Sequence, residues 1–124
     1  MADSILNSTK KILGLAADYT AFDLDIITHI NGVFSTLDQI GVGPVGGFYI
    51  EDEEETWDDF TAPPNQLNLV RTYVFLKVRM LFDPPGTSYL IEAMNKQIQE
   101  HEYRLNLFRE NIVQEAVNAL EEVP

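Results

Sequence analysis

The sequence predicts an all-α fold, a small bundle of four to five helices with one long acidic loop between the second and third helices. Three observations predict it. Apolar residues recur at spacings of three and four along four stretches, which is the period of an amphipathic helix. Glycine and proline mark the ends of these stretches. Between residues 41 and 64 the helical spacing is absent, and this segment includes five consecutive carboxylates.

The first helix is expected from about Asp3 to Leu13, with Asp3 or Ser4 as its N-cap and Gly14 just after its end. The second follows residues 20–23, TAFD, which resemble a capping box with Asp where Glu or Gln is usual. It should end near Gly41. Its apolar face consists of Phe22, Ile26, Ile27, Ile30, Val33, Phe34, Leu37 and Ile40.

The third helix, about Asn65 to Phe82, is apolar over most of its circumference. This is typical of the central helix of a bundle, or of one packed between the core and a neighbouring subunit. Residues 83–86, DPPG, end it, because proline cannot continue a helix. The fourth helix starts near Thr87 or Ser88 and extends to about Asn111 or beyond. Its apolar seam is Ile91, Met94, Ile98, Leu105, Phe108 and Ile112, interrupted at His101.

The acidic loop, residues 41–64, begins with a glycine-rich stretch and closes at two prolines. A loop of this length in a compact domain is usually functional or disordered, and a β-hairpin-like excursion is compatible with its short β-prone run, residues 48–50. Apolar residues flank the carboxylates of Glu51 to Glu55. Since aromatic side chains in water would form a sticky patch, we expect the flanking residues to pack on the subunit or on a neighbour: Phe48, Tyr49, Ile50, Trp57 and Phe60.

Charge is distributed unevenly along the chain. The formal net charge is −12; residues 1–62 carry 12 acidic and 2 basic side chains, a net of −10, and residues 63–124 carry 8 and 6, a net of −2. Binding DNA through its phosphates requires clustered Lys and Arg, so this balance argues against nucleic-acid binding. A negative surface would instead repel DNA, as a wall past which DNA slides must do.

Composition excludes several other classes. The absence of cysteine rules out a disulfide framework, a thiolate metal site and a cysteine nucleophile. We expect no signal peptide, and no apolar stretch approaches the roughly 20 residues that a membrane span requires. The length of 124 residues fits one soluble domain. Within it we expect a helical body, residues 1–109, and a C-terminal extension that binds a partner, residues 110–124.

The search for catalytic chemistry finds no site. His29 and His101 lack the clustered spacing of a metal or base site, and both are interpreted as bundle or interface residues. The carboxylates of Glu51 to Glu55 lack the alternating pattern of a calcium loop and are interpreted as a solvated loop, with a patch facing a channel or a partner as the alternative. The glycine-rich stretch imitates a dinucleotide fingerprint but has neither the preceding strand nor the following helix. The sequence therefore predicts no enzyme, no cofactor and no metal.

Four segments of the chain carry a resemblance to a known family: DYTAFD (residues 18–23), IITHIN (26–31), TWDDF (56–60) and TYVFLKVRMLFDPP (72–85). They resemble the head–tail connector proteins, also called head completion or adaptor proteins, of long-tailed bacteriophages. The likeness spans roughly residues 4–109. It is a likeness of the whole pattern, because none of these segments is a chemical motif.

The resemblance implies a structural virion protein at the head–tail junction, assembled in the host cytoplasm. About twelve copies would form a homo-oligomeric ring under the portal protein, extend the DNA channel without binding DNA specifically, and dock a stopper or tail-completion protein. The implied portal-binding residues are Phe108, Arg109, Ile112, Val113, Ala116, Val117, Leu120 and Val123. Those of the channel or next-ring loop are Phe48, Tyr49, Ile50, Glu51, Asp52, Glu53, Glu54, Glu55 and Trp57, and the candidate subunit–subunit residues are Arg71, Tyr73, Lys77 and Arg79.

A second hypothesis comes from another class of protein. An acidic inhibitor or DNA mimic would bind a basic host protein, and the net charge of −10 in the first half gives this reading support. Mimics spread carboxylates along an elongated face, whereas much of the charge here lies in one loop. A metal-dependent enzyme ranks third.

Overall fold

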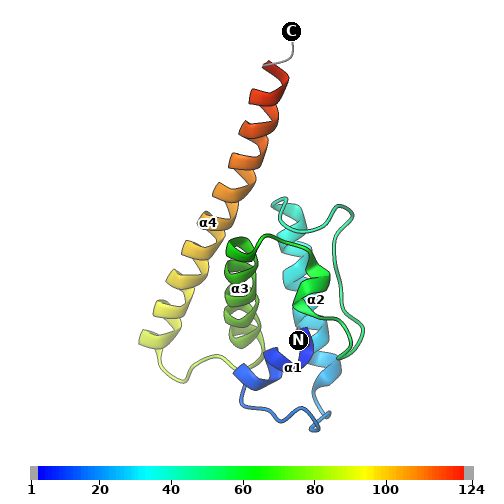
Figure 1. The fold of residues 1–124 in the computed structure, drawn as a ribbon. Coiled ribbons are helices and arrows are strands. Elements are labelled where there is room, and N and C mark those ends of the chain that lie inside the picture. Colours follow the sequence, from blue (N-terminus) through cyan, green and yellow to red (C-terminus); the bar gives the residue numbers. More distant parts are fainter. Residues whose placement is uncertain (1–2, 122–124) are drawn as a thin grey trace.

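The computed structural model describes residues 3–121, apart from the side chains of residues 111–113, 116 and 121. Its elements are α1 (Ile5–Ile12), α2 (Asp23–Gln39), the short 3-10 helix η1 (Trp57–Phe60), α3 (Pro64–Phe82) and α4 (Ser88–Glu121) (Figure 1). The predicted all-α class is confirmed. The hairpin is not confirmed, because residues 3–121 include no strand, only an isolated antiparallel bridge between Ser4 and Thr56.

The helix ends follow local chemistry at most positions. The Ser4 hydroxyl accepts a hydrogen bond from the Asn7 amide (3.2 Å) and caps α1, as predicted. Gly14 and Gly41 follow α1 and α2 with φ of 80° and 82°, a region that costs other residues free energy. Pro64 occupies the first turn of α3, where its missing N–H is not needed.

The start of α2 differs from the prediction. Phe22 is the N-cap and makes no side-chain capping bond, so the expected capping box at Thr20 and Asp23 is wrong. The Asp23 carboxylate instead pairs with the Lys10 ammonium at 2.8 Å. The Lys10 side chain is 1% exposed and also donates to the Ala17 carbonyl at 3.0 Å. A buried cation needs such partners, and this tertiary demand outweighs a local cap.

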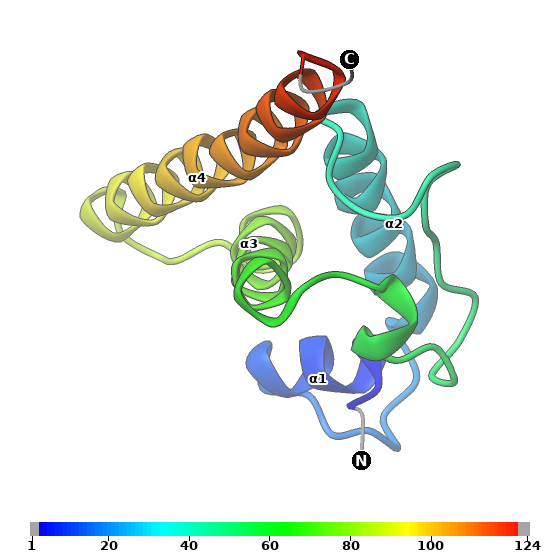
Figure 2. The same cartoon turned by 45° about the horizontal axis from the view of Figure 1, so that its top comes forward.

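The helices pack around α3. Figures 1 and 2 both place α3 between α2 on one side and α4 on the other, with α1 crossing near their lower end. This agrees with the apolar circumference expected of a central helix. The buried helical core consists of Ile5, Leu6, Ile26, Ile30, Val33, Phe34, Leu37, Val70, Tyr73, Val74, Val78, Ile98 and Leu105.

Helix α4 is much longer than the body it packs against. Its 34 residues correspond to about 51 Å at 1.5 Å per residue. Ile98 and Leu105 anchor it in the core, and beyond them it continues past the other helices with no break at residues 109–110 (Figure 1). We call residues 110–121 the C-terminal arm.

Candidate assembly surfaces

Aromatic packing fixes the chain on both sides of the five consecutive carboxylates, Glu51 to Glu55, which we call the acidic run. Phe34 of α2 stacks on Phe60 at 5.4 Å between ring centroids and meets the edge of Phe48 at 5.2 Å. Trp57 lies 6.3 Å from Phe34 and donates its indole N–H to the Ser8 hydroxyl at 2.9 Å. Such pairs contribute about 0.5–1.5 kcal/mol each beyond their buried area. The loop flanks therefore belong to the core, as expected for aromatics packed on the subunit.

Tyr49 is the exception among the flanking residues. Ile50, Trp57 and Phe60 are buried and Phe48 is partly buried, whereas the Tyr49 side chain is 65% exposed. Extended residues alternate between faces, so Phe48 and Ile50 turn inward while Tyr49 turns outward. Tyr49, one of the residues predicted to contact the channel or the next ring, therefore does not pack on its own chain.

The carboxylates themselves are organised by backbone hydrogen bonds. The Glu55 carboxylate accepts the amides of Glu51 (2.8 Å) and Asp52 (3.3 Å), and Asp52 accepts the amide of Glu54 (2.8 Å). Residues 51–54 are exposed. The carboxylates of Glu51, Glu53 and Glu54 make no ion pair within the described residues. Asp52 and Glu55 have no ion pair there either, so all five charges of Glu51 to Glu55 lack a cationic partner within the described residues.

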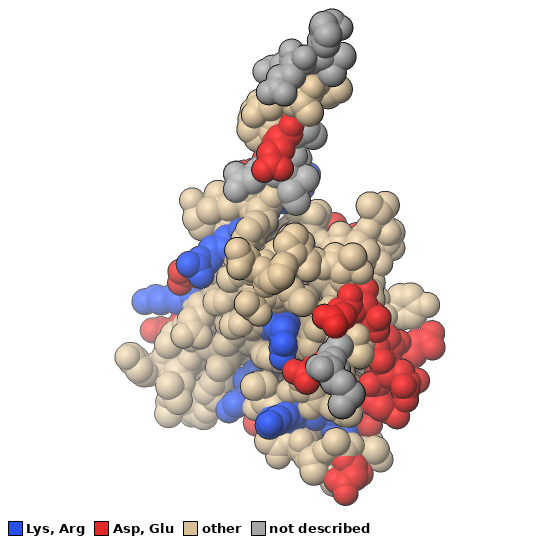
Figure 3. All heavy atoms as spheres, in the orientation of Figure 1, with Lys and Arg blue, Asp and Glu red and all other residues tan. Residues whose placement is uncertain are grey.

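Acidic and basic side chains are unevenly distributed over the molecule. Residues 12–63, which form α2, the acidic loop and η1, contain 11 carboxylates and no Lys or Arg. Helix α3 carries three basic residues and no acidic one, whereas α4 carries both signs. In Figure 3 many acidic side chains gather on the side where the loop runs, and the visible basic ones lie elsewhere. The acidic side of one molecule is therefore complementary in charge to α3 of another.

The candidate subunit contacts on α3 differ in exposure. Arg71 lies 5.5 Å over the Trp57 ring, and Lys77 lies 6.0 Å over the Tyr73 ring; both are partly exposed, as is Arg79. Tyr73 is fully buried and donates its hydroxyl to the Glu102 carboxylate at 3.0 Å. Burial, with this hydrogen bond and charge, raises the pKa of Tyr73 above its usual range. Tyr73 therefore joins α3 to α4 and offers no surface to a neighbour.

The predicted portal-binding residues fall on the second half of α4. Phe108 is partly buried, and Arg109 lies against the end of α2, where a Cβ at Gly41 would come within 2.6 Å of its Nε. Val117 and Leu120 are 40% and 75% exposed on the C-terminal arm. Val123 and the side chains of Ile112, Val113 and Ala116 lie outside the described residues.

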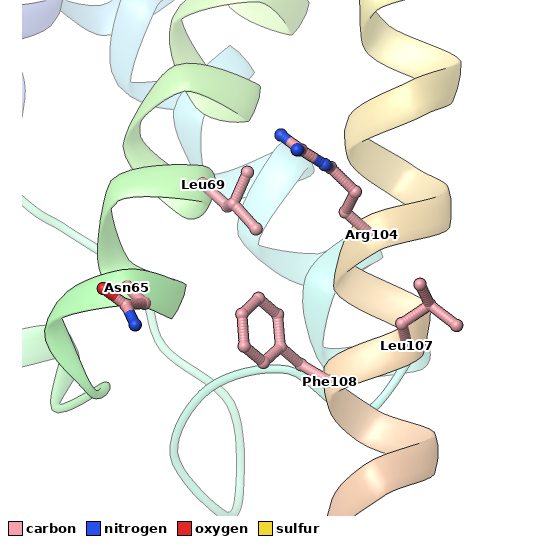
Figure 4. Close-up of a pocket in the computed structure, with 5 residues that line it drawn as sticks. All are labelled: Asn65, Leu69, Arg104, Leu107 and Phe108. Atoms are coloured by element: carbon pink, nitrogen blue, oxygen red, sulfur yellow. The ribbon is translucent and has the colours of Figure 1, made fainter.

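A hollow between α3 and α4 was missed by the sequence analysis. It encloses about 380 Å³ and is lined by Asn65, Leu69, Arg104, Leu107 and Phe108. In Figure 4 Leu69, Arg104 and Phe108 point into the gap, and Leu107 lies on its outer edge. The Arg104 side chain is 55% exposed and has only a distant ion pair, 4.0 Å from Glu100. Helix packing brings together residues that are more than 30 positions apart in the sequence. The only signal of this hollow in the sequence is Leu107, an apolar residue outside the predicted apolar seam of the fourth helix. We call this site the α3–α4 hollow.

Neither a metal-ligand cluster nor a membrane-spanning helix is found in the described part of the chain. No group of three or more His, Cys, Asp or Glu side chains could hold a metal ion there. His101 lies within 2.7 Å of the Gln97 carbonyl in its own helix, and His29 is partly buried. None of the helices within residues 3–121 combines the length and apolar character needed to cross a bilayer.

Fold and surfaces together define a small all-helical protein with a long terminal helix and one side that carries acidic but no basic residues. The family comparison specifies the class: the model of the phage connector protein family matches residues 5–112, and the chain belongs to this family. The family indicates a structural role in connecting phage head and tail. Comparison with curated proteins and with solved structures gives no match.

Proposed function

We propose that the chain is a head–tail connector subunit that forms a ring of about twelve copies under the portal. The ring extends the DNA channel and provides the docking surface for a stopper or tail-completion protein. One observation carries this proposal. The C-terminal arm leaves the body with Val117 and Leu120 exposed, and a helix that cannot bury its apolar residues on its own subunit is suited to a partner's groove.

The segment from about Phe108 to Val123 is the proposed portal-binding element. Side chains on one face of a helix recur every three or four residues, so Val117 and Leu120 are presented together. The arm carries Glu110, Glu115 and Glu121 and no basic residue, which favours a portal surface with exposed cations.

The exposed carboxylates are proposed to line the channel or to face the next ring. At physiological ionic strength the screening length is about 8 Å, so only charges near the lumen would act on passing DNA. Rotational symmetry would repeat Glu53 and Glu54 in every copy and add their fields. DNA would then pass without adhesion. The partly exposed cations Arg71, Lys77 and Arg79 are proposed to meet the acidic side of an adjacent copy.

The arm can be tested with two leucines of equal exposure. Leu120 on the arm is 75% exposed and Leu24 on α2 is 77% exposed, so Leu24→Asp is a matched control for Leu120→Asp. We expect Leu120→Asp to weaken binding of the full chain to purified portal by tenfold or more, measured by interferometry, and Leu24→Asp to leave it unchanged. Negative-stain images should show rings with the wild type on the portal. Equal binding by both variants, or a wild type that never associates with portal, would refute the proposal.

A further inference from the structure

Tyr49 is an exposed aromatic held by a rigid support. The amide of the Asn31 side chain bonds both backbone groups of Ile50, accepting from its N–H at 2.8 Å and donating to its carbonyl at 2.9 Å. Ile50 is buried, and the preceding Phe48 packs on Phe34 and Phe60. The backbone on both sides of Tyr49 is therefore fixed. A rigid aromatic loses little conformational entropy on binding, which makes it a good interface anchor.

Glu51 lies two positions after Tyr49, at the start of a bend, and is also exposed. The Glu51 amide is bound by Glu55, whereas its carboxylate is exposed and has no ion pair within the described residues. The loop thus presents an exposed aromatic ring and an exposed carboxylate two positions apart in the sequence.

The α3–α4 hollow has the complementary chemistry. Leu69, Leu107 and Phe108 provide apolar walls, Arg104 provides a half-exposed guanidinium, and the volume of about 380 Å³ can receive an aromatic side chain. The residues that line the hollow belong to α3 and α4, whereas the loop of residues 41–56, which carries Tyr49, runs beside α2 on the other side of α3 (Figures 1 and 2). A single molecule therefore cannot fill its own hollow with its own tyrosine.

We propose that Tyr49 of one copy inserts into the α3–α4 hollow of the next copy, with Glu51 facing Arg104. Charge complementarity identifies a second copy as the occupant. The side formed by residues 12–63 has 11 carboxylates and no basic residue, so two such sides repel each other and a symmetric dimer through them is disfavoured. The contact is instead head-to-tail, the type that generates a ring when its rotation closes. This inference rests on the proposed ring and assigns its contact residues, leaving Glu53 and Glu54 for the channel.

The contact can be captured with a photo-crosslinker that keeps an aromatic ring at the anchor position. p-Benzoylphenylalanine replaces Tyr49 in one variant and Tyr89 in the matched control, a tyrosine that is 79% exposed at the start of α4. The full chains are irradiated at millimolar concentration as mixtures of isotope-labelled and unlabelled protein, so that intermolecular peptides are recognised by mass. We expect at least about tenfold more dimer from the Tyr49 probe, with crosslinks to residues 65–69 and 104–108 of the other copy. Equal yields, or Tyr49 crosslinks elsewhere, overturn the inference.

Charge reversal tests the polar half of the contact. Glu51→Arg and Arg104→Glu should each lower the crosslinking yield of the Tyr49 probe severalfold. The yield should be restored in a mixture in which one copy carries the probe and Glu51→Arg and the other copy carries Arg104→Glu. Unchanged yields, or no restoration, overturn the pairing. Rings on the portal without the 65–69 and 104–108 crosslinks would refute this contact and retain the proposed function. The crosslinks without rings would retain the contact and refute the ring.

Discussion

The contact between Gly41 and Arg109 fixes where α4 leaves the body, and Gly41→Ala tests it. Gly41 has a φ of 82°, and an added Cβ would lie 2.6 Å from Arg109 Nε and 2.7 Å from its Cδ. Gly14 is an internal control, since its φ is 80° and nothing lies within 4 Å of an added Cβ. The two substitutions share the backbone strain and differ only in the clash.

The expected magnitudes follow from these distances. A left-handed conformation costs an L-residue roughly 1–2 kcal/mol, so Gly14→Ala should lower the free energy of unfolding by about that amount. Gly41→Ala must also displace the Arg109 side chain from the carboxyl end of α2, where a cation contributes about 0.3–1 kcal/mol. We therefore expect Gly41→Ala to lower the free energy of unfolding by about 0.5–1 kcal/mol more than Gly14→Ala does. This difference combines the lost interaction of the Arg109 cation with the end of α2 and the lost packing of its side chain.

Urea denaturation followed by circular dichroism measures both variants, with m-values compared to verify that the unfolded state is unchanged. A double-mutant cycle with Arg109→Ala isolates the clash, because in that background the two glycine substitutions should cost the same. Equal costs for the two glycines in the wild-type background would show that Arg109 does not hold the end of α2. The conclusion would be the same if Gly41→Ala still cost more than Gly14→Ala in the Arg109→Ala background.

Three further predictions concern the core. Asp23→Ala should cost about 3 kcal/mol and more than Lys10→Met, because only the former leaves a buried cation unpaired; equal costs in urea denaturation would contradict this. Tyr73→Phe should flatten the alkaline decline of stability. The raised pKa keeps Tyr73 protonated when folded, so stability is complete below about pH 10 and falls above it by up to about 1.4 kcal/mol per pH unit, a slope that unfolding curves from pH 8 to 11 would detect. Phe34→Ala should cost about 3–5 kcal/mol and increase protease cleavage within the acidic loop, and cleavage equal to the wild type would refute the anchoring role of this ring.

Much of the fold was predictable because the helical signals are local. Apolar spacing and punctuation by Gly14, Gly41 and Pro84 placed α1, α2, α3 and the start of α4 to within a few residues, whereas α4 runs about ten residues past the predicted minimum end at Asn111. The start of α2 was mispredicted because Asp23 pairs with Lys10, thirteen positions earlier, and no local pattern encodes that pairing. Four of the five apolar residues that flank the carboxylates pack on the chain as expected, because exposed aromatics are unfavourable, and Tyr49 does not.

The candidate surfaces were less predictable because they depend on which side chains packing leaves free. Tyr73 lies on the same helix as three partly exposed cations, yet it is buried by α4 and bonded to Glu102. The α3–α4 hollow unites Leu69 and Arg104 only after two helices have packed. The exposure of Tyr49 is a more local feature, because Tyr49 lies between the partly buried Phe48 and the buried Ile50 and neighbouring side chains of an extended segment point to opposite faces.

The length of the C-terminal arm raises the question of what keeps it helical. Residues 110–121 are 12 in number, and isolated helices shorter than about 12–15 residues are marginal in water because nucleation is costly. The arm avoids that nucleation step, since α4 is already formed where Leu105 is buried and Arg109 meets Gly41. Its helix extends a formed one, so each added turn depends on the previous turn. Amide hydrogen exchange should therefore accelerate progressively from Leu105 toward Leu120 in the isolated chain and slow along the whole arm when portal binds. Uniform protection along α4 without a partner would mean that the arm is stabilised by its own subunit, and the argument for an unpartnered helix would fail.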